Sequence, residues 1–169
     1  MFTAILSKSS WVQPPPPNLV PNPDMEIDCC WNGWSENPSG NNPYGNNQST
    51  EQVQSGNYSR KVDTDPVPLN SGIASDPFTV AGGSTIYDVS FWIYLPVVSN
   101  QLLVSFYDGD GGLKSATQIG FGTPAGVWVE KTVVFQSFTA GPNARLAFVS
   151  DQNEELTFFV DNIQFRKRI

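Results

Sequence analysis

Aromatic and amide side chains gather in one short polar stretch of the sequence. The aromatic residues are Trp31, Trp34 and Tyr44, and the amide side chains are Asn41, Asn42, Asn46 and Gln48. Aromatic faces stack on the C–H groups of a pyranose ring, while amide side chains can hold its hydroxyl groups. This combination favours a sugar-binding surface. A second interpretation stays open, in which one of Trp31 and Trp34 plugs the core.

Two further aromatic residues, Trp92 and Tyr94, lie in the apolar run 86–95. Residues two apart in a strand point to the same side. These two side chains could therefore line a groove together. The alternative for Trp92 is the core, because a tryptophan in the middle of a strand is seldom exposed.

Catalytic chemistry finds no support in the sequence. The chain has no histidine, so the commonest general base is missing. A serine or cysteine nucleophile would lack its usual partner, and no motif marks a carboxylate pair among the 16 acidic residues. The run DGDGG at 108–112 fails as a calcium loop, since Ile119 stands where a glutamate is needed. We therefore expect a protein that is not an enzyme.

Composition favours a single all-β domain. The chain has 169 residues, of which 39% are hydrophobic and 15% are charged, with 14 glycines and 14 prolines. A net charge of -7 speaks against nucleic-acid binding, because that depends on lysine and arginine. No apolar run approaches the ~18 residues of a membrane span, so no membrane partner is expected. The run Phe2 to Leu6 is too short for a signal peptide.

The elements that must position these residues are short strands separated by turn residues. The predicted strands are 58–62, 78–80, 86–95, 102–107, 118–121, 127–135, 145–149 and 156–165. Residues 35–52 are rich in Asn, Gly, Pro and Ser and predict a loop. This spacing of strands and turns indicates a β-sandwich or jelly roll.

The first 17 residues differ from the rest of the chain. Residues 1–12 mix apolar and hydroxyl side chains, and Pro14 to Pro17 then favour a stiff polyproline II segment. We expect an extended arm over residues 1–17, followed by one domain over residues 18–169. The alternative for the arm is a disordered tail.

Five segments resemble, in order, the carbohydrate-binding modules of the cellulose- and xylan-binding type. They are NLVPNPDME at 18–26, SGNYSRKV at 55–62, YDVSFWIYLP at 87–96, GVWVEKTVVF at 126–135 and FFVDNIQF at 158–165. The resemblance implies a jelly-roll β-sandwich of two antiparallel sheets. It also implies that the opening segment is an edge strand and that Trp128 packs between the sheets.

The resemblance further implies a structural calcium ion shared by the first and last strands. Its side-chain ligands here would be Glu26 and Asp161, with main-chain carbonyls completing the six to eight oxygens that calcium takes. The alternative is that Asp161 caps a turn and that Glu26 is solvated.

Modules of this kind normally accompany an enzyme, whereas this chain has an arm in that place. This suits a virion-surface protein of a phage, such as a capsid decoration, fibre or tail appendage. The arm Met1–Pro17 would anchor to the protein shell or tail, and the sandwich would adhere to surface glycans. The alternative is a soluble extracellular carbohydrate-binding module that serves a polysaccharide-degrading enzyme.

Overall fold

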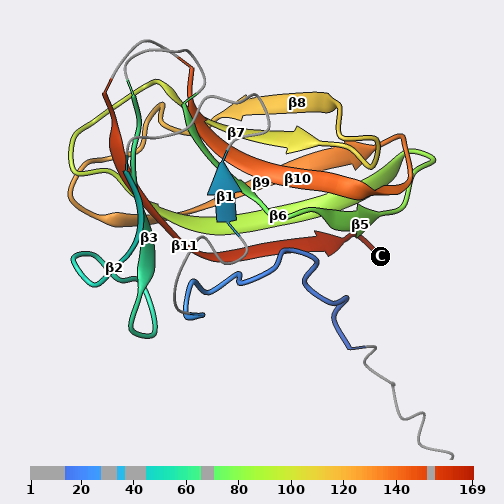
Figure 1. Cartoon of the computed structure of the whole chain (residues 1–169), viewed down its shortest axis with the longest axis horizontal. Coiled ribbons are helices and arrows are strands. Elements are labelled where there is room, and N and C mark those ends of the chain that lie inside the picture. The colour runs from blue at the N-terminus through green and yellow to red at the C-terminus, as the bar shows by residue number, and fades with distance from the viewer. Residues whose placement is uncertain (1–13, 28–33, 37–44, 66–70, 152–154) are drawn as a thin grey trace, which may run out of the picture.

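The computed structural model describes residues 14–27, 34–36, 45–65, 71–151 and 155–169, and in these it consists of strands joined by turns and bends. Within these ranges, eleven strands form two antiparallel sheets that pack face to face (Figure 1). The predicted all-β jelly-roll β-sandwich of two antiparallel sheets is confirmed. No helix in these ranges is long and apolar enough to cross a membrane.

Each sheet mixes strands from distant parts of the chain. One has the order β1 (Trp34–Glu36), β4 (Gly72–Ser75), β10 (Gly141–Ser150), β7 (Leu102–Tyr107) and β8 (Leu113–Gln118), with β5 (Phe78–Val80) also paired to β10. The other has the order β2 (Gly45–Ser49), β3 (Ser59–Asp63), β11 (Thr157–Lys167), β6 (Thr85–Tyr94) and β9 (Trp128–Ser137). We call them the six-stranded and the five-stranded sheet.

Most predicted strands coincide with observed ones, but one is wrong. The bounds of β5 and β7 are those predicted, whereas Gln118 ends β8 and the residues after it turn. Ile119 and Gly120 both donate their amides to the carbonyl of Leu102, at 2.9 and 3.1 Å. Strands β1, β2, β4 and β8 were not predicted, and β2 lies within the predicted loop.

Aromatic rings from both sheets interlock in the core. Phe91 of β6 meets Phe148 of β10 edge to face at 4.9 Å between centroids, and Phe106 of β7 stacks on Phe135 of β9 at 5.4 Å. Trp34 is fully buried, with its ring centroid 5.8 Å from that of Phe148. Burying each such side chain contributes about 1.5–3 kcal/mol, so these contacts hold the two sheets together.

The opening segment of the domain lies along β11, which brings the two ends of the domain together. The amide of Leu19 donates to the carbonyl of Phe165 at 3.0 Å, and that of Ile163 to the carbonyl of Pro23 at 2.7 Å. The side chain of Asn18 bonds the main chain of both Ile163 and Phe165, each at 2.8 Å. The expected closure is therefore present.

The opening segment was expected to be an edge strand, but the structure shows that it is not a regular one. Asn22 and Met25 have positive φ angles of 43° and 59°, which bend the chain out of an extended ladder. Figure 1 shows this segment in blue, beside the carboxyl-terminal end of β11. Residues 1–13 of the predicted arm lie outside the described residues. Pro16 and Pro17 line a pocket together with Lys167, Arg168 and Ile169.

Candidate functional site

Strand β6 directs alternate side chains to opposite sides of the five-stranded sheet. Tyr87, Val89, Phe91 and Ile93 are buried in the core, whereas the residues between them are only half-buried. Trp92 and Tyr94 therefore point away from the core. The expectation that they share one face is confirmed, and that face is the outer one.

Trp128 of β9 joins this outer face. The antiparallel register places Trp128 opposite Tyr94, and their ring centroids are 5.7 Å apart with the planes at 53°. Val129 and Val133 point to the other side of β9 and pack against the core. The expectation that Trp128 packs between the sheets is wrong, because the register gives it the same side as Tyr94.

Phe159 of β11 continues the row on the other side of Tyr94. The two ring centroids are 5.7 Å apart and the planes meet at 84°. Phe159 is only 2% exposed, since Lys61 covers it with its Nζ 5.8 Å from the ring centroid. We call Phe159, Tyr94 and Trp128 the aromatic row. Its two half-buried members, Tyr94 and Trp128, are the rings that a ligand can reach.

Polar side chains border the aromatic row. A groove of about 270 Å³ is lined by Glu51, Gln52, Lys61, Tyr94, Pro96, Thr157 and Phe159. The ammonium group of Lys61 pairs with the carboxylate of Glu51 at 2.9 Å, and this pair raises the pKa of Lys61. The ammonium group donates, the carboxylate accepts, and the amide of Gln52 can do both. Such a set suits the hydroxyl groups of a sugar.

The loop that connects β2 to β3 forms one wall of this groove, and the two predicted metal ligands hold it. Asp161 accepts the amides of Gln54 and Ser55, each at 3.2 Å through Oδ2. Glu26 accepts those of Asn57 and Tyr58 through Oε1, at 2.7 and 2.9 Å. The two carboxylates thus position the loop that carries Glu51 and Gln52.

These surroundings shift the two carboxyl groups in opposite directions. Burial raises the pKa of Asp161 to about 6, against the lowering effect of its hydrogen bonds, and the charge of Glu26 raises it further. The pKa of Glu26 is lowered, because the amides of Tyr58 and Asn57 and the side chain of Asn57 stabilise its charged form.

The structure brings Glu26 and Asp161 to the same loop, as the calcium prediction requires. The two carboxylates lie beside this loop, and both already accept hydrogen bonds from main-chain N–H groups. In the described ranges no three acidic side chains gather as a metal-binding group. Any ion would thus depend on main-chain carbonyls for most of its oxygens. Calcium binding at Glu26 and Asp161 stays a prediction.

Three described residues of the stretch 31–48, namely Trp34, Asn46 and Gln48, turn inward to the fold. Trp34 is fully buried and cannot offer a ring face to a sugar, so its prediction as a binding residue is wrong. The alternative, that one of the two tryptophans fills the core, is confirmed for Trp34. Asn46 accepts a hydrogen bond from Nε of the buried Arg60, and Gln48 donates to the carbonyl of Met25 at 2.7 Å. Trp31, Tyr44, Asn41 and Asn42 lie outside the described residues.

Sequence reasoning missed Trp128, Phe159 and Lys61 as site residues. Each lies on a different strand, and only the pairing of β9, β6, β11 and β3 places them side by side. The sequence signal that could have indicated Trp128 and Phe159 is the alternation of side chains in the strands VWVEKTVVF and FFVDN. Alternation separates the two faces of a strand but does not say which one is the outer face.

Comparison with known proteins supports the fold. No protein-family model and no curated protein matches the sequence. The CBM22-1 xylan-binding domain of Paenibacillus barcinonensis Xyn10C superposes with a TM-score of 0.56 and 17% identity, over 85% of this chain and 90% of that one. The second family 16 carbohydrate-binding module superposes with a TM-score of 0.59 and 18% identity, over 88% and 99%.

A phage protein shares the same fold. The enzymatically active domain of tailspike protein 4 of bacteriophage CBA120 superposes with a TM-score of 0.63 and 14% identity, over 89% of this chain and 21% of that one. The chain therefore has the jelly-roll fold of carbohydrate-binding modules, and this fold also occurs within a larger phage protein.

Proposed function

We propose that this protein is a non-catalytic module that binds a polysaccharide chain across the outer face of its five-stranded sheet. The observation that carries the proposal is the pair of half-buried rings, Tyr94 and Trp128, beside the groove that Lys61, Glu51 and Gln52 line. Rings of this kind stack on sugars, and the polar groups hold hydroxyls.

The geometry of the rings favours a single polysaccharide chain over a crystalline surface. A flat crystal face needs rings that share one plane, but Tyr94 and Trp128 are tilted by 53°. A separate chain can turn from one sugar to the next and so follow both rings. The ligand class proposed is therefore a soluble, unbranched or lightly substituted polysaccharide.

Isothermal titration with xylan, glucomannan and mixed-linkage glucan tests the proposal. We expect binding of at least one of them, and a loss of about tenfold in affinity in Tyr94→Ala, since a stacked ring contributes about 1.5 kcal/mol. Thr132→Ala is the matched control, because Thr132 lies on the same outer face of β9 but away from the aromatic row. Binding that is unchanged in Tyr94→Ala would refute this site.

We further propose that the module is displayed on a phage particle, anchored by its amino-terminal arm. The proline-rich spacer and the occurrence of the same fold in a phage tailspike support this proposal. The alternative is that the module binds polysaccharide on behalf of a polysaccharide-degrading enzyme. The similarity of its fold to a xylan-binding domain supports this alternative.

Deletion of residues 1–13 separates the two roles. It leaves Pro16 and Pro17 in contact with the end of β11, so stability and polysaccharide affinity should not change. Co-sedimentation with phage particles should be lost if the arm is the anchor. Retained co-sedimentation would contradict anchoring by the arm.

A further inference from the structure

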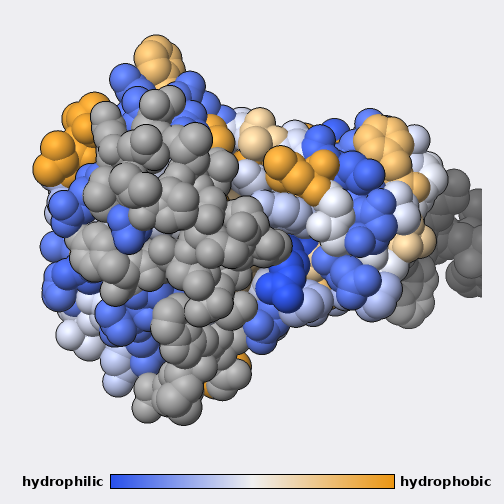
Figure 2. Space-filling model, turned by 45° about the horizontal axis from the view of Figure 1, so that its top comes forward, coloured by the Kyte–Doolittle hydropathy of each residue, from blue (hydrophilic) through white to orange (hydrophobic). Residues whose placement is uncertain are grey.

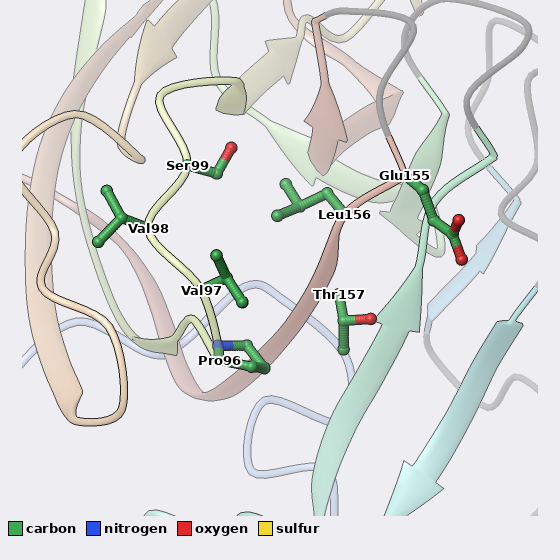
Figure 3. Close-up of a pocket in the computed structure, with 7 residues that line it drawn as sticks. All are labelled: Pro96, Val97, Val98, Ser99, Glu155, Leu156 and Thr157. Carbon is green, nitrogen blue, oxygen red and sulfur yellow. The ribbon is translucent and has the colours of Figure 1, made fainter.

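A second pocket opens at the end of the groove, and its walls are mostly aliphatic. Its volume is about 400 Å³, and its lining includes Pro96, Val97, Ser99, Leu156 and Thr157. Figure 3 shows the side chains of Val97 and Leu156 directed into the space between the loop after β6 and the start of β11, whereas the carboxylate of Glu155 points away. We call this the aliphatic pocket.

The aliphatic pocket adjoins the groove beside the aromatic row. Pro96 and Thr157 line both spaces, and Pro96 follows Tyr94 by two residues. A sugar stacked on Tyr94 would therefore carry its substituents within reach of the pocket. Figure 2 shows apolar surface at the left end of the molecule, the end at which β6 finishes and β11 begins in Figure 1.

The chemistry of this pocket does not match an unsubstituted sugar. A bare pyranose carries hydroxyl groups around its edge, and its flat C–H faces suit aromatic rings better than the branched side chains of Val97 and Leu156. Val97 is nevertheless 72% exposed, and its apolar surface stays in water unless a ligand covers it. An acyl group linked to a sugar hydroxyl as an ester would supply the missing apolar partner.

A hydroxyl group in the lining suits the ester carbonyl. The oxygen of Ser99 accepts the amide of Gln101 at 3.1 Å, which orients this side chain. Its O–H can donate to a carbonyl oxygen. The hydroxyl of Thr157, by contrast, donates to the carboxylate of Asp63 at 2.6 Å. Ser99 is therefore the side chain that we assign to the ester.

We propose that the aliphatic pocket binds an ester-linked acyl substituent of the polysaccharide, so that the module prefers acylated over unsubstituted chains. This inference rests on the proposed polysaccharide binding and specifies its substrate class. The acyl group lies against Val97 and Leu156, while the sugar that bears it stacks on Tyr94.

Titration with one polysaccharide before and after ester removal tests the inference. The probes are acetylated xylan and feruloylated arabinoxylan, each also after mild alkali, which hydrolyses the esters and leaves the backbone intact. We expect tighter binding of an esterified form, by about fourfold for each methyl group buried, from the transfer free energy of a CH₂ group. The two probes show whether a small or an aromatic acyl group fills the pocket.

Val97→Asn should abolish this preference and leave the affinity for the de-esterified chain unchanged. Val134→Asn is the matched control, because Val134 is likewise an exposed valine, at 50%, but lies on β9, away from the pocket. Equal affinity for both forms of both probes would overturn the inference while leaving polysaccharide binding intact. A preference that survives Val97→Asn would overturn it as well. Failure of every form to bind would instead refute the proposed function.

Discussion

The two faces of β6 both carry aromatic side chains, but in different surroundings. On the inner face, Tyr87 and Phe91 are fully buried, and Phe91 meets Phe148 of the opposite sheet. On the outer face, Trp92 and Tyr94 are half-buried, and Tyr94 contacts the rings of Trp128 and Phe159 on the neighbouring strands. The inner rings join two sheets, whereas the outer rings lie on one.

This difference separates stability from binding within a single strand. A ring with partners on all sides loses both its apolar burial and its packing when it is truncated. A ring on the open face loses less, because water already reaches part of it. The outer rings can therefore change with the ligand while the inner rings keep the sandwich together.

The largest expected effect is on the inner face. Phe91→Ala should lower the free energy of unfolding by about 3–5 kcal/mol, since it leaves a cavity in a packed core. Chemical denaturation measures this value, and the affinity of the folded protein for polysaccharide should not change. A loss below about 1 kcal/mol would contradict the central place of Phe91 in the core.

The matching change on the outer face should reduce polysaccharide affinity more than stability. Trp128→Ala should reduce polysaccharide affinity about tenfold, because the stacked ring is lost. Its free energy of unfolding should fall by less than that of Phe91→Ala, since Trp128 is half-buried. Titration and denaturation of the two variants side by side check this. A larger stability loss in Trp128→Ala would break the distinction between the faces.

The pH dependence of stability tests the loop that borders the outer face. The pKa of Asp161 is about 6 in the folded protein, above the value of about 3.9 in an unfolded chain. The folded state therefore holds this proton more tightly, and its contribution to stability grows as the pH falls and is lost as the pH rises through 6. Between pH 7 and pH 5 we expect a gain of about 1 kcal/mol.

Asp161→Asn should remove this gain, and thermal unfolding at the two pH values with a chelator present measures it. At lower pH the lowered pKa values of Glu26 and Asp88 act in the other direction, so their stabilisation is lost on further acidification. A wild-type protein that loses stability between pH 7 and pH 5 without metal would contradict the assignment to Asp161.

Added calcium tests whether Glu26 and Asp161 bind the predicted ion. If the ion binds at Glu26 and Asp161, added Ca²⁺ should raise the unfolding temperature at pH 7, and the increment should shrink at pH 5 as Asp161 takes up its proton. Asp161→Asn should remove the increment, with Mg²⁺ as the control ion. No calcium effect at pH 7 would show that the N–H groups alone hold the loop.

The smallest expected effect belongs to Lys61. Lys61→Met keeps an apolar cover over Phe159 but removes the ammonium group that can hold a sugar hydroxyl. We expect a two- to tenfold loss of affinity, in line with about 0.5–1.5 kcal/mol for one hydrogen bond. Stability should hardly change, because the pair with Glu51 reaches solvent, with side-chain exposures of 26% and 62%, and such pairs contribute about 0–1 kcal/mol. Titration against the same polysaccharide checks this, and an unchanged affinity would remove Lys61 from the site.

The site could be predicted from the sequence only in part. Trp92 and Tyr94 were found because strand alternation links residues two apart. Trp128 and Phe159 depend on register across β9, β6 and β11, which a single strand does not reveal. Within the polar stretch 31–48, the amide side chains of Asn46 and Gln48 bond Arg60 and the carbonyl of Met25 inside the fold, which amide composition alone does not reveal.

By itself, the sequence determined that the chain forms short strands separated by turns, and its resemblance to carbohydrate-binding modules implied that Glu26 and Asp161 come to the same place. Apolar alternation, β-branched residues and turn residues act locally, and they mark strands such as β5 and β7 without reference to the rest of the molecule. Only the tertiary structure decided that Trp34 is buried and that Trp128 is outside. Both depend on which face of a strand meets the other sheet, and that is settled by packing between residues far apart in the chain.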